Sequence, residues 1–396
     1  MPRDLILFLH GISGSALRDR QTGKLSWGRP SYLLGWRDYY LHRLPYKPGE
    51  PDRATNGPVL DWIWFSHLFK LRVAFYENLF RVLRERAGRT QGDLDAPSAD
   101  ADFYVWSYDW RQSVGDVAQR LDDVVERLLE FYQNPDLKIT LISHSTAGLA
   151  AMHWFAFGGA ELRETDTTPT PNFPRRRNLG RMIQIGVPHR GTLKVMFDLT
   201  WGIRVLPAGR RYHPDFLFSM PPMYELLPFD SAGCFADAAG APLDIDMHRL
   251  DDWYRWRLGP FTRFPHLLED EDARAFLSRT LPRAKRLQRA LIQPWPDEMR
   301  DHVHIVSSSA FATLRRMRAS ERGLDTAAAM AACKTGEWEN ATDRSDVAAG
   351  DWFASAESLM ALPHRPEHLH TARCAHRYLF TDADAQRGLV EALKGD

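Results

Sequence analysis

A single run at residues 137–148, Leu-Lys-Ile-Thr-Leu-Ile-Ser-His-Ser-Thr-Ala-Gly, constrains the fold of this chain more than any other. Its first six residues predict a buried strand, residues 147–157 predict a helix, and Ser145 falls at the tight bend between them. This context is typical of a nucleophile elbow, where strand and helix approach so closely that only small residues fit two positions either side of the serine. Ser143 and Ala147 are small, although glycines are usual there. Taken alone, the run fits a serine-rich turn capping an ordinary helix equally well.

The rest of the chain alternates strand and helix patterns. Strands are predicted at 5–9, 103–108, 137–142, 182–186 and 302–306, and helices around 76–83, 117–132, 147–157 and 386–393. This alternation predicts an α/β fold, with a mainly parallel sheet covered by helices on both faces.

Two stretches interrupt this alternation and set the domain boundaries. Strand signals vanish between about 190 and 300, where Trp, Pro, Arg and Met dominate. We predict a core of residues 1–18, 59–190 and 301–396, an irregular insertion at 19–58 near the site, and a cap or lid at 191–300.

Composition excludes several classes of function. The 396 residues carry 51 basic and 51 acidic side chains, so no net field attracts nucleic acid. Cys234, Cys333 and Cys374 are too scattered for a disulfide framework, which fits a reducing compartment. The apolar run at 5–9 is too short for a signal peptide, and no stretch reaches the length of a membrane span. We therefore expect a cytoplasmic protein.

A serine nucleophile needs a base, an acid that orients the base, and two donors for the oxyanion. One donor would be the amide of Thr146, directly after Ser145, and the second the amide of Ile12, in the loop after the first strand. Gly11 allows that loop to turn, although His10 and Gly11 equally suit a simple strand end.

The acid and the base each have several candidates late in the chain. Acids are available at Asp343, Asp346 and Asp351, each of which also suits a turn or a cap. Possible bases are His364, His368, His370 and His376. Because these four histidines lie close together in the sequence, they also suggest a metal cluster. Cys374 is the one soft ligand nearby, however, and no pairing of the histidines on one face of a helix is clear. We expect neither a metal nor a cofactor.

Five segments in chain order resemble one known family. They are His-Gly-Ile-Ser-Gly-Ser-Ala-Leu at 10–17, Tyr-Asp-Trp-Arg at 108–111, Ser-His-Ser-Thr-Ala-Gly at 143–148, Gly-Val-Pro-His-Arg-Gly at 186–191 and Tyr-Glu-Leu-Leu-Pro at 224–228. Together they resemble the lecithin:cholesterol acyltransferase family and its related bacterial lipases, which belong to the α/β-hydrolase superfamily.

The resemblance implies an α/β-hydrolase fold with a mobile lid over an acyl pocket. It favours Asp351 as the acid, since Gly-Asp-Trp-Phe-Ala-Ser at 350–355 resembles the family's acid segment, and His376 as the base. It also implies that the tetrapeptide at 108–111 braces the sheet near the site. Gly11, His144, Trp352 and Phe353 are assigned to substrate binding, and the last two replace a Gly-Thr pair of the family and reshape the site. The family's secreted members are disulfide-bonded, so transfer to cholesterol does not carry over.

The leading hypothesis is a serine hydrolase or acyltransferase that cleaves or transfers the acyl group of a carboxylic, lipid-type ester through an acyl-enzyme on Ser145. Under this hypothesis the binding partner is the acyl-ester or lipid substrate. The hypothesis allows transient contact with a membrane surface and includes no nucleic-acid partner. One alternative is a catalytically idle fold that binds lipid or protein. Another is a thioesterase or lactonase acting on a small metabolite.

Two further segments each allow two interpretations. Trp62, Ile63, Trp64, Phe65, Leu68, Phe69 and Leu71 suit either a lipid-facing element or, with their helical spacing, a buried helix. Arg283, Lys285, Arg286 and Arg289 suit either contact with anionic lipid or a solvated helix face.

Overall fold

The protein is described by a computed structural model that covers residues 4–34, 36, 39–66, 71–165, 169–204, 209–325, 336–341 and 344–394. Its centre is a seven-stranded sheet in the order β16-β11-β9-β8-β1-β7-β6, and every neighbouring pair is parallel. The strands are β1 Asp4–Leu9, β6 Gln91–Gly92, β7 Phe103–Trp106, β8 Lys138–His144, β9 Leu179–Ile185, β11 Val303–Ser308 and β16 Leu369–Ala372. The predicted mainly parallel α/β sheet is confirmed.

Helices cover both faces of this sheet because the strands are apolar on both sides. In β1, Leu5, Leu7 and Leu9 pack into the cluster that contains α3 (Val114–Phe131) and α4 (Ala147–Phe157). Ile6 and Phe8 pack into the opposite cluster, with α2 (Glu77–Arg81) and α12 (Ala383–Lys394). Continuous apolar strands of this kind are expected where a parallel sheet is buried on both faces. The architecture is that of an α/β-hydrolase.

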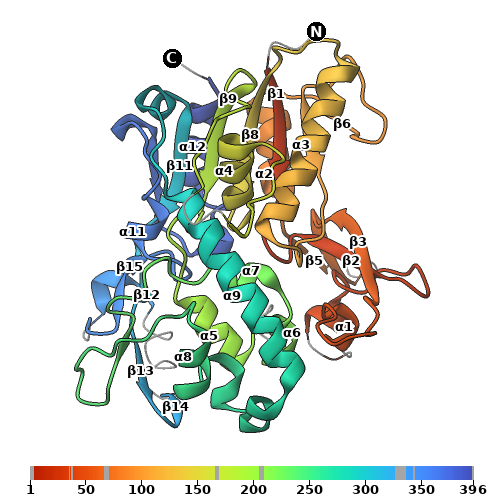
Figure 1. Ribbon diagram of the computed structural model, residues 1–396. Coiled ribbons are helices and arrows are strands. Elements are labelled where there is room, and N and C mark those ends of the chain that lie inside the picture. The colour runs from red at the N-terminus through yellow and green to blue at the C-terminus, as the bar shows by residue number, and fades with distance from the viewer. Residues whose placement is uncertain are drawn as a thin grey trace.

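A group of helices gathers at one end of the sheet (Figure 1). They are α5 Lys194–Trp201, α6 Pro214–Phe218, α7 Pro221–Glu225, α8 Leu250–Arg255 and α9 Glu271–Leu291. The longest, α9, begins at Asp270, whose carboxylate accepts from the amides of Asp272 and Ala273. These helices lie within the segment in which the sequence shows no strand signal. The small strand β10 (Phe235–Ala236) nevertheless pairs with β13 (Met317–Ser320), beyond residue 301.

Further small sheets lie outside the central one. β12 (Phe311–Leu314) pairs with β15 (Val347–Gly350), and β13 pairs with β14 (Gly323–Leu324). The short helix α11 (Ala356–Leu359) follows β15. The sequence pattern did not predict these two- to four-residue strands, which are too short to establish a period.

The segment predicted to be irregular at 19–58 is bounded by paired strands. β2 (Ser15–Asp19) pairs antiparallel with β3 (Ala54–Val59), and the short helix α1 (Pro30–Leu33) lies between them. β3 contains Asn, Gly and Pro, residues that are depleted in strands, so its sequence gives little strand signal.

The helix interpretation for the aromatic segment near residue 62 is wrong. β4 (Trp62–Ser66) pairs antiparallel with β5 (Leu71–Ala74), and the guanidinium of Arg72 lies 3.7 Å from the ring centre of Trp62. Leu68 and Phe69 lie outside the described residues. Aromatic residues favour strands as well as cores, so their spacing over so short a run did not decide between helix and strand.

Candidate active site

The candidate nucleophile lies on the sharp turn between β8 and α4. Ser145 has φ 55°, in the left-handed region that non-glycine residues rarely adopt. Its amide donates to the carbonyl of Ile185 at 3.0 Å, and its own carbonyl accepts from the amide of Gly148 at 3.0 Å. The elbow is therefore held from both sides in a strained conformation, as is common at functional positions.

Close packing explains why the neighbours of Ser145 are small. Ser143 and Ala147 are buried. A Cβ added at Gly148 would lie 2.3 Å from a methyl carbon of Val187, so α4 approaches the end of β9 without room for a side chain. A Cβ added at Gly11 would likewise lie 2.9 Å from the Cβ of Ser145. The first loop of the chain thus lies directly against the elbow.

Ser145, His376 and Asp351 form a continuous hydrogen-bonded chain. His376 Nε2 lies 3.1 Å from Ser145 Oγ, and His376 Nδ1 lies 2.6 Å from Asp351 Oδ2. Because a carboxylate only accepts, the proton of the neutral imidazole is on Nδ1, and Nε2 presents a lone pair to the serine hydroxyl. Ser145 is 6% exposed and Asp351 0%. The geometry suits proton transfer from the hydroxyl to the imidazole.

Backbone groups hold the side chains of Asp351 and His376 in place. Asp351 Oδ1 accepts from the amides of Phe353 at 3.0 Å and Ala354 at 2.8 Å, while the amide of His376 donates to the carbonyl of Asp351 at 2.8 Å. Gly186, at φ 58°, lets the imidazole approach the end of β9, since a Cβ there would lie 3.0 Å from His376 Nδ1. The carboxylate and the imidazole are therefore preorganised.

The other acids and histidines named from the sequence lie elsewhere. Asp346 pairs with Arg316 at 2.9 Å and Arg318 at 3.0 Å, and Asp343 lies outside the described residues. His368 and His370 stack on His304, with ring centres 3.9 and 5.9 Å apart. His364 bonds the carbonyl of Leu362 at 2.7 Å.

Two backbone amides are available to an oxyanion beside Ser145. Within the described part of the chain, the amides of Ile12 and Thr146 donate to no protein acceptor. The amide of Gly11, by contrast, donates to the hydroxyl of Tyr76 at 3.1 Å. In the turn that follows, the amide of Gly14 donates to the carbonyl of Gly11 at 3.0 Å, and Ser13 has φ 68°.

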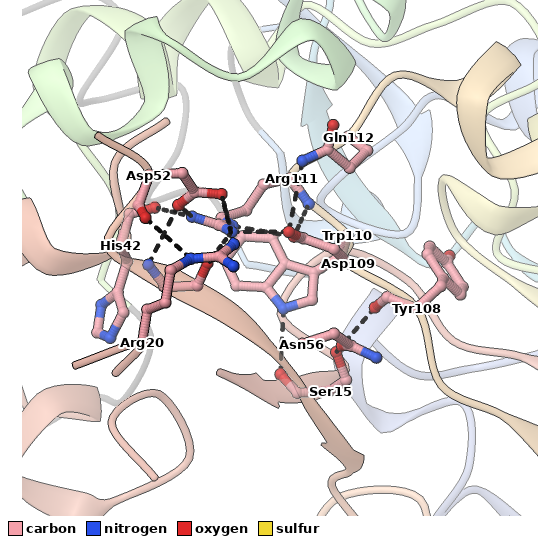
Figure 2. Close-up of polar contacts among 11 residues, drawn as sticks. Ser15, Arg20, His42, Asp52, Asn56, Tyr108, Asp109, Trp110, Arg111 and Gln112 are labelled. Carbon is pink, nitrogen blue, oxygen red and sulfur yellow. Dashed lines mark hydrogen bonds and ion pairs between the residues drawn. The ribbon is translucent and has the colours of Figure 1, made fainter. Parts of the chain in front are cut away.

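The Tyr-Asp-Trp-Arg segment holds the loop that contains Ile12 at both of its ends. The ring of Tyr108 stacks on His10 with centres 4.2 Å apart, and its hydroxyl donates to the carbonyl of His10. At the other end, Trp110 Nε1 donates to the carbonyl of Ser15 at 3.1 Å, as Figure 2 shows. The first contact reaches the residue after β1 and the second reaches the start of β2, so residues that follow β7 hold the loop at both ends.

Arg111 connects this brace to the segment between β2 and β3 (Figure 2). Its fully buried guanidinium pairs with Asp109 at 2.7 Å and Asp52 at 3.0 Å. It also donates to the carbonyls of His42 and Ala54, each at 3.2 Å. A buried cation with this many partners fixes the geometry of the segments it joins.

A narrow, mainly apolar slot lies between the loop that contains Ile12 and the start of α4. Ile12, Thr146, Trp110, Val117, Ala150 and Pro222 are among its lining residues. Its free volume is about 10 Å³, which is roughly one water-sized sphere. Pro222, from α7, closes part of the slot.

Two other helices hold the short helix α7. The carboxylate of Glu225 accepts from the amide of Val114, at the first turn of α3, at 2.8 Å. Gln288 of α9 donates to the carbonyls of Glu225 at 3.2 Å and Leu227 at 2.9 Å. Both contacts hold the C-terminal end of α7, whereas no side chain caps its N-terminal end at Met220.

The residues assigned to substrate binding differ in position. The ring of Phe353 packs on His376 with centres 4.7 Å apart, while Trp352 is 41% exposed at φ 75° and lies 5.2 Å from the ammonium of Lys194. His144 faces the protein interior, where its Nδ1 lies 2.9 Å from the hydroxyl of Tyr76.

Sequence reasoning missed Tyr76. In the predicted helix at residues 76–83, Tyr76 takes an apolar position. Its hydroxyl group was therefore the one sequence signal that pointed to a polar role.

Comparison with known proteins supports the fold. No protein-family model matches the chain. No curated protein matches it either. Among solved structures, it is similar to a chain in "The crystal structure of Tle4-Tli4 complex", with a TM-score of 0.62 and 14% sequence identity over 100% of this chain and 99% of that chain. Similarity at this identity supports the fold alone.

Proposed function

We propose that this protein is a serine hydrolase that cleaves carboxylic esters of the lipid type, through Ser145, His376 and Asp351. The observation that carries the proposal is the chain of two hydrogen bonds, 3.1 and 2.6 Å long, that joins a strained serine to a buried aspartate through one imidazole. A buried turn with an ordinary structural role does not require this geometry.

In the proposed reaction, Ser145 Oγ attacks the ester carbonyl carbon while His376 Nε2 takes its proton. The oxyanion that forms accepts hydrogen bonds from the amides of Ile12 and Thr146, and Thr146 lies at the start of a helix whose dipole also favours negative charge. His376 then protonates the departing alkoxide, which leaves an acyl group on Ser145. Water, activated by the same imidazole, releases the acid, or an acceptor alcohol takes the acyl group.

The slot beside the amides supports acyl binding next to Ser145. Its walls are mainly apolar and include the two residues that carry the proposed oxyanion donors, so an acyl group bound at those donors would adjoin apolar side chains. The slot must widen before it can admit the acyl chain. In this proposal, residues 191–300 act as the cap, and Pro222 limits how far the acyl chain enters.

Exposed aromatic side chains near the site support transient contact with a lipid surface. Trp352 is 41% exposed and Tyr378 is 46% exposed, and each lies within two residues of a member of the proposed triad. Indole and phenol rings favour the boundary between water and lipid. Among the described helices, none is long and apolar enough to cross a membrane.

An activity-based probe tests the proposal. A fluorophosphonate should label the wild-type protein and fail to label Ser145→Ala, and the same substitution should lower ester hydrolysis by about 10⁴-fold or more. The control is Ser358→Ala, which removes another buried hydroxyl, one that donates to the carbonyl of Gly191. A folded wild-type protein that takes up no label would indicate an idle fold that binds lipid or protein.

Substrate series separate the remaining alternatives. Initial rates on p-nitrophenyl esters of increasing acyl length, on acyl thioesters and on lactones give three comparable measurements. We expect the esters to be preferred. Rates on thioesters or lactones that exceed those on esters of equal size would contradict the proposed substrate class.

A further inference from the structure

Tyr76 occupies a buried position between the proposed oxyanion loop and the nucleophile elbow. It follows β5 and directly precedes α2, and it is 1% exposed. Its ring packs edge-on against Phe8 and Phe380, with centres 4.9 and 5.1 Å apart. Because rings on two sides confine it, the hydroxyl is held at a defined point.

The hydroxyl of Tyr76 bonds to both elements at once. The amide of Gly11 donates to it at 3.1 Å, and its oxygen lies 2.9 Å from His144 Nδ1. The direction of both bonds follows from their chemistry, because an amide can only donate. Tyr76 therefore accepts from Gly11 and donates its own proton to His144, which places the ring proton of His144 on Nε2.

The protonation state of His144 agrees with this direction. Burial, followed by the nearby His376 and His10, holds the pKa of His144 well below its usual range, so the ring is neutral and Nδ1 can accept. The ring centres of His144 and His376 lie 5.2 Å apart. A positive charge on His144 would repel the imidazolium that forms on His376 in the proposed reaction. Protonation of His144 would occur at Nδ1, which already accepts the hydrogen bond from Tyr76.

The arrangement has a consequence for catalysis. The bond from Gly11 to Tyr76 uses the amide that precedes Ile12 and leaves the amide of Ile12 for the substrate. His144 directly precedes Ser145, and Thr146, the second proposed donor, directly follows it. Tyr76 thus links the two chain segments that carry the proposed oxyanion donors and sets the distance between them.

We propose that Tyr76 is a positioning residue that sets the amide of Ile12 relative to Ser145, through Gly11 on one side and His144 on the other. This inference rests on the proposed function. A residue of this kind acts on the transition state, where the oxyanion exists, and has little effect on binding of the ground-state ester.

The substitution Tyr76→Phe tests the inference, since it keeps the ring and removes both hydrogen bonds. We expect kcat for a p-nitrophenyl ester to fall about 10- to 100-fold while KM changes less than about twofold, because small misplacements of catalytic groups cost this much. An alkyl trifluoromethyl ketone forms a tetrahedral adduct that bears the oxyanion. Its inhibition constant should rise by a factor similar to the fall in kcat, whereas that of a non-cleavable ether analogue should not change.

The matched control is Tyr104→Phe. Tyr104 is also fully buried, and its hydroxyl lies 2.7 Å from the hydroxyl of Tyr132, far along the chain from the elbow. This variant should keep the wild-type kcat and the wild-type affinity for the ketone. A Tyr76→Phe protein that is as active as wild type, or that changes both inhibitors equally, would overturn the inference.

Substitution of His144 provides a second test that leaves Tyr76 in place. Asn carries a hydrogen-bonding group near the position of Nδ1, so His144→Asn should retain most of kcat, and His144→Leu should lose as much as Tyr76→Phe. The double variant Tyr76→Phe/His144→Leu should be no worse than either single one, because each substitution breaks the same connection between Gly11 and His144. Additive losses would contradict the inference. Should Tyr76→Phe fail to fold, wild-type kcat in His144→Leu would contradict it.

The two proposals fail in different ways. A folded wild-type protein without Ser145-dependent hydrolysis refutes the proposed function and with it the role of Tyr76. Normal Ser145-dependent hydrolysis with an undiminished Tyr76→Phe rate refutes the role of Tyr76 alone.

Discussion

Two buried polar networks lie close together in this protein, and they differ in how completely their groups are paired. Around Arg111, each guanidinium nitrogen donates to a carboxylate or a carbonyl. Around Ser145, the amides of Ile12 and Thr146 have no acceptor in the described chain, and the serine is strained. The pairing around Arg111 is complete, whereas the network around Ser145 leaves two donors for the oxyanion of the proposed reaction. Complete pairing indicates a structural brace, and open donors beside a nucleophile indicate a site.

The largest expected effect comes from a substitution that breaks the network around Ser145 without disturbing the network around Arg111. Asp351→Asn keeps the size of the side chain but favours the wrong tautomer of His376, so kcat should fall about 10³- to 10⁴-fold. The free energy of unfolding, measured by urea titration, should change far less than the activity. Loss of folding in parallel with loss of activity would show that Asp351 is a structural residue.

The second prediction concerns the network around Arg111, where we expect the loss of stability to be the main effect. Arg111→Met leaves the buried carboxylate of Asp109 without its cation, while Asp52 keeps Arg20 at 3.8 Å, so the free energy of unfolding should fall by about 3 to 5 kcal/mol. The exposed pair Arg176 and Glu298, with side chains 55% and 51% exposed, provides the control. Arg176→Met should cost less than about 1 kcal/mol. Equal costs in urea titrations would remove the distinction between the buried brace and a surface pair.

The buried carboxyl group of Glu225 adds to this comparison, because its main hydrogen-bond partner is the backbone amide of Val114 and not an arginine. Burial raises the pKa of Glu225 to about 7, from an ordinary value of 4.5. The folded protein therefore binds this proton more tightly than the unfolded chain. Its contribution to stability is complete below about pH 4.5 and is lost as the pH rises towards 7.

The substitution Glu225→Gln removes this titration while keeping an oxygen for the amide of Val114. Above pH 7 the variant should be more stable than wild type, by an amount on the order of 3 kcal/mol, and the difference should shrink towards pH 5. Urea titrations at several pH values measure it. A difference that does not vary with pH would show that Glu225 stays charged when folded.

The smallest effect concerns backbone strain beside the acid. Trp352 has φ 75°, which costs a non-glycine residue about 1 to 2 kcal/mol. Trp352→Gly and Trp352→Ala both remove the indole, so their difference reports the backbone alone. The glycine variant should be more stable in urea by about 1 kcal/mol. An alanine variant of equal stability would show that the turn relaxes without cost.

The sequence predicted five of the seven strands of the central sheet, because each of these five is an apolar run long enough to identify. The two-residue strand β6 and the four-residue strand β16, which contains His370 and Thr371, form no such run and were missed. The elbow was also predictable, since Ser145 lies between the strand and the helix that form it. The hairpin of β4 and β5 was not, because aromatic residues over five positions suit a helix or a strand. The strands β12 to β15 were missed because none exceeds four residues.

Candidate site residues were ranked differently by spacing and by resemblance. Spacing alone left Asp343, Asp346 and Asp351 as equal candidates, and family resemblance favoured the last. In the structure, Asp346 pairs with two arginines that precede it by about 30 residues, a contact that no local pattern encodes. Tyr76 was missed for a similar reason, because its partners, Gly11 and His144, lie 65 and 68 positions away in the sequence. Long-range hydrogen bonds of this kind are a property of the fold.

The short helix α7 depends on its neighbours, because a helix of five residues has little stability of its own. At its C-terminal end, the amide of Val114, at the first turn of α3, donates to the carboxylate of Glu225, and Gln288 of α9 donates to the carbonyl of Glu225. In the proposed reaction, Pro222 would therefore leave the slot only if these bonds broke or if α9 moved with α7. Substrate entry would then be coupled to the packing of the proposed cap against α3.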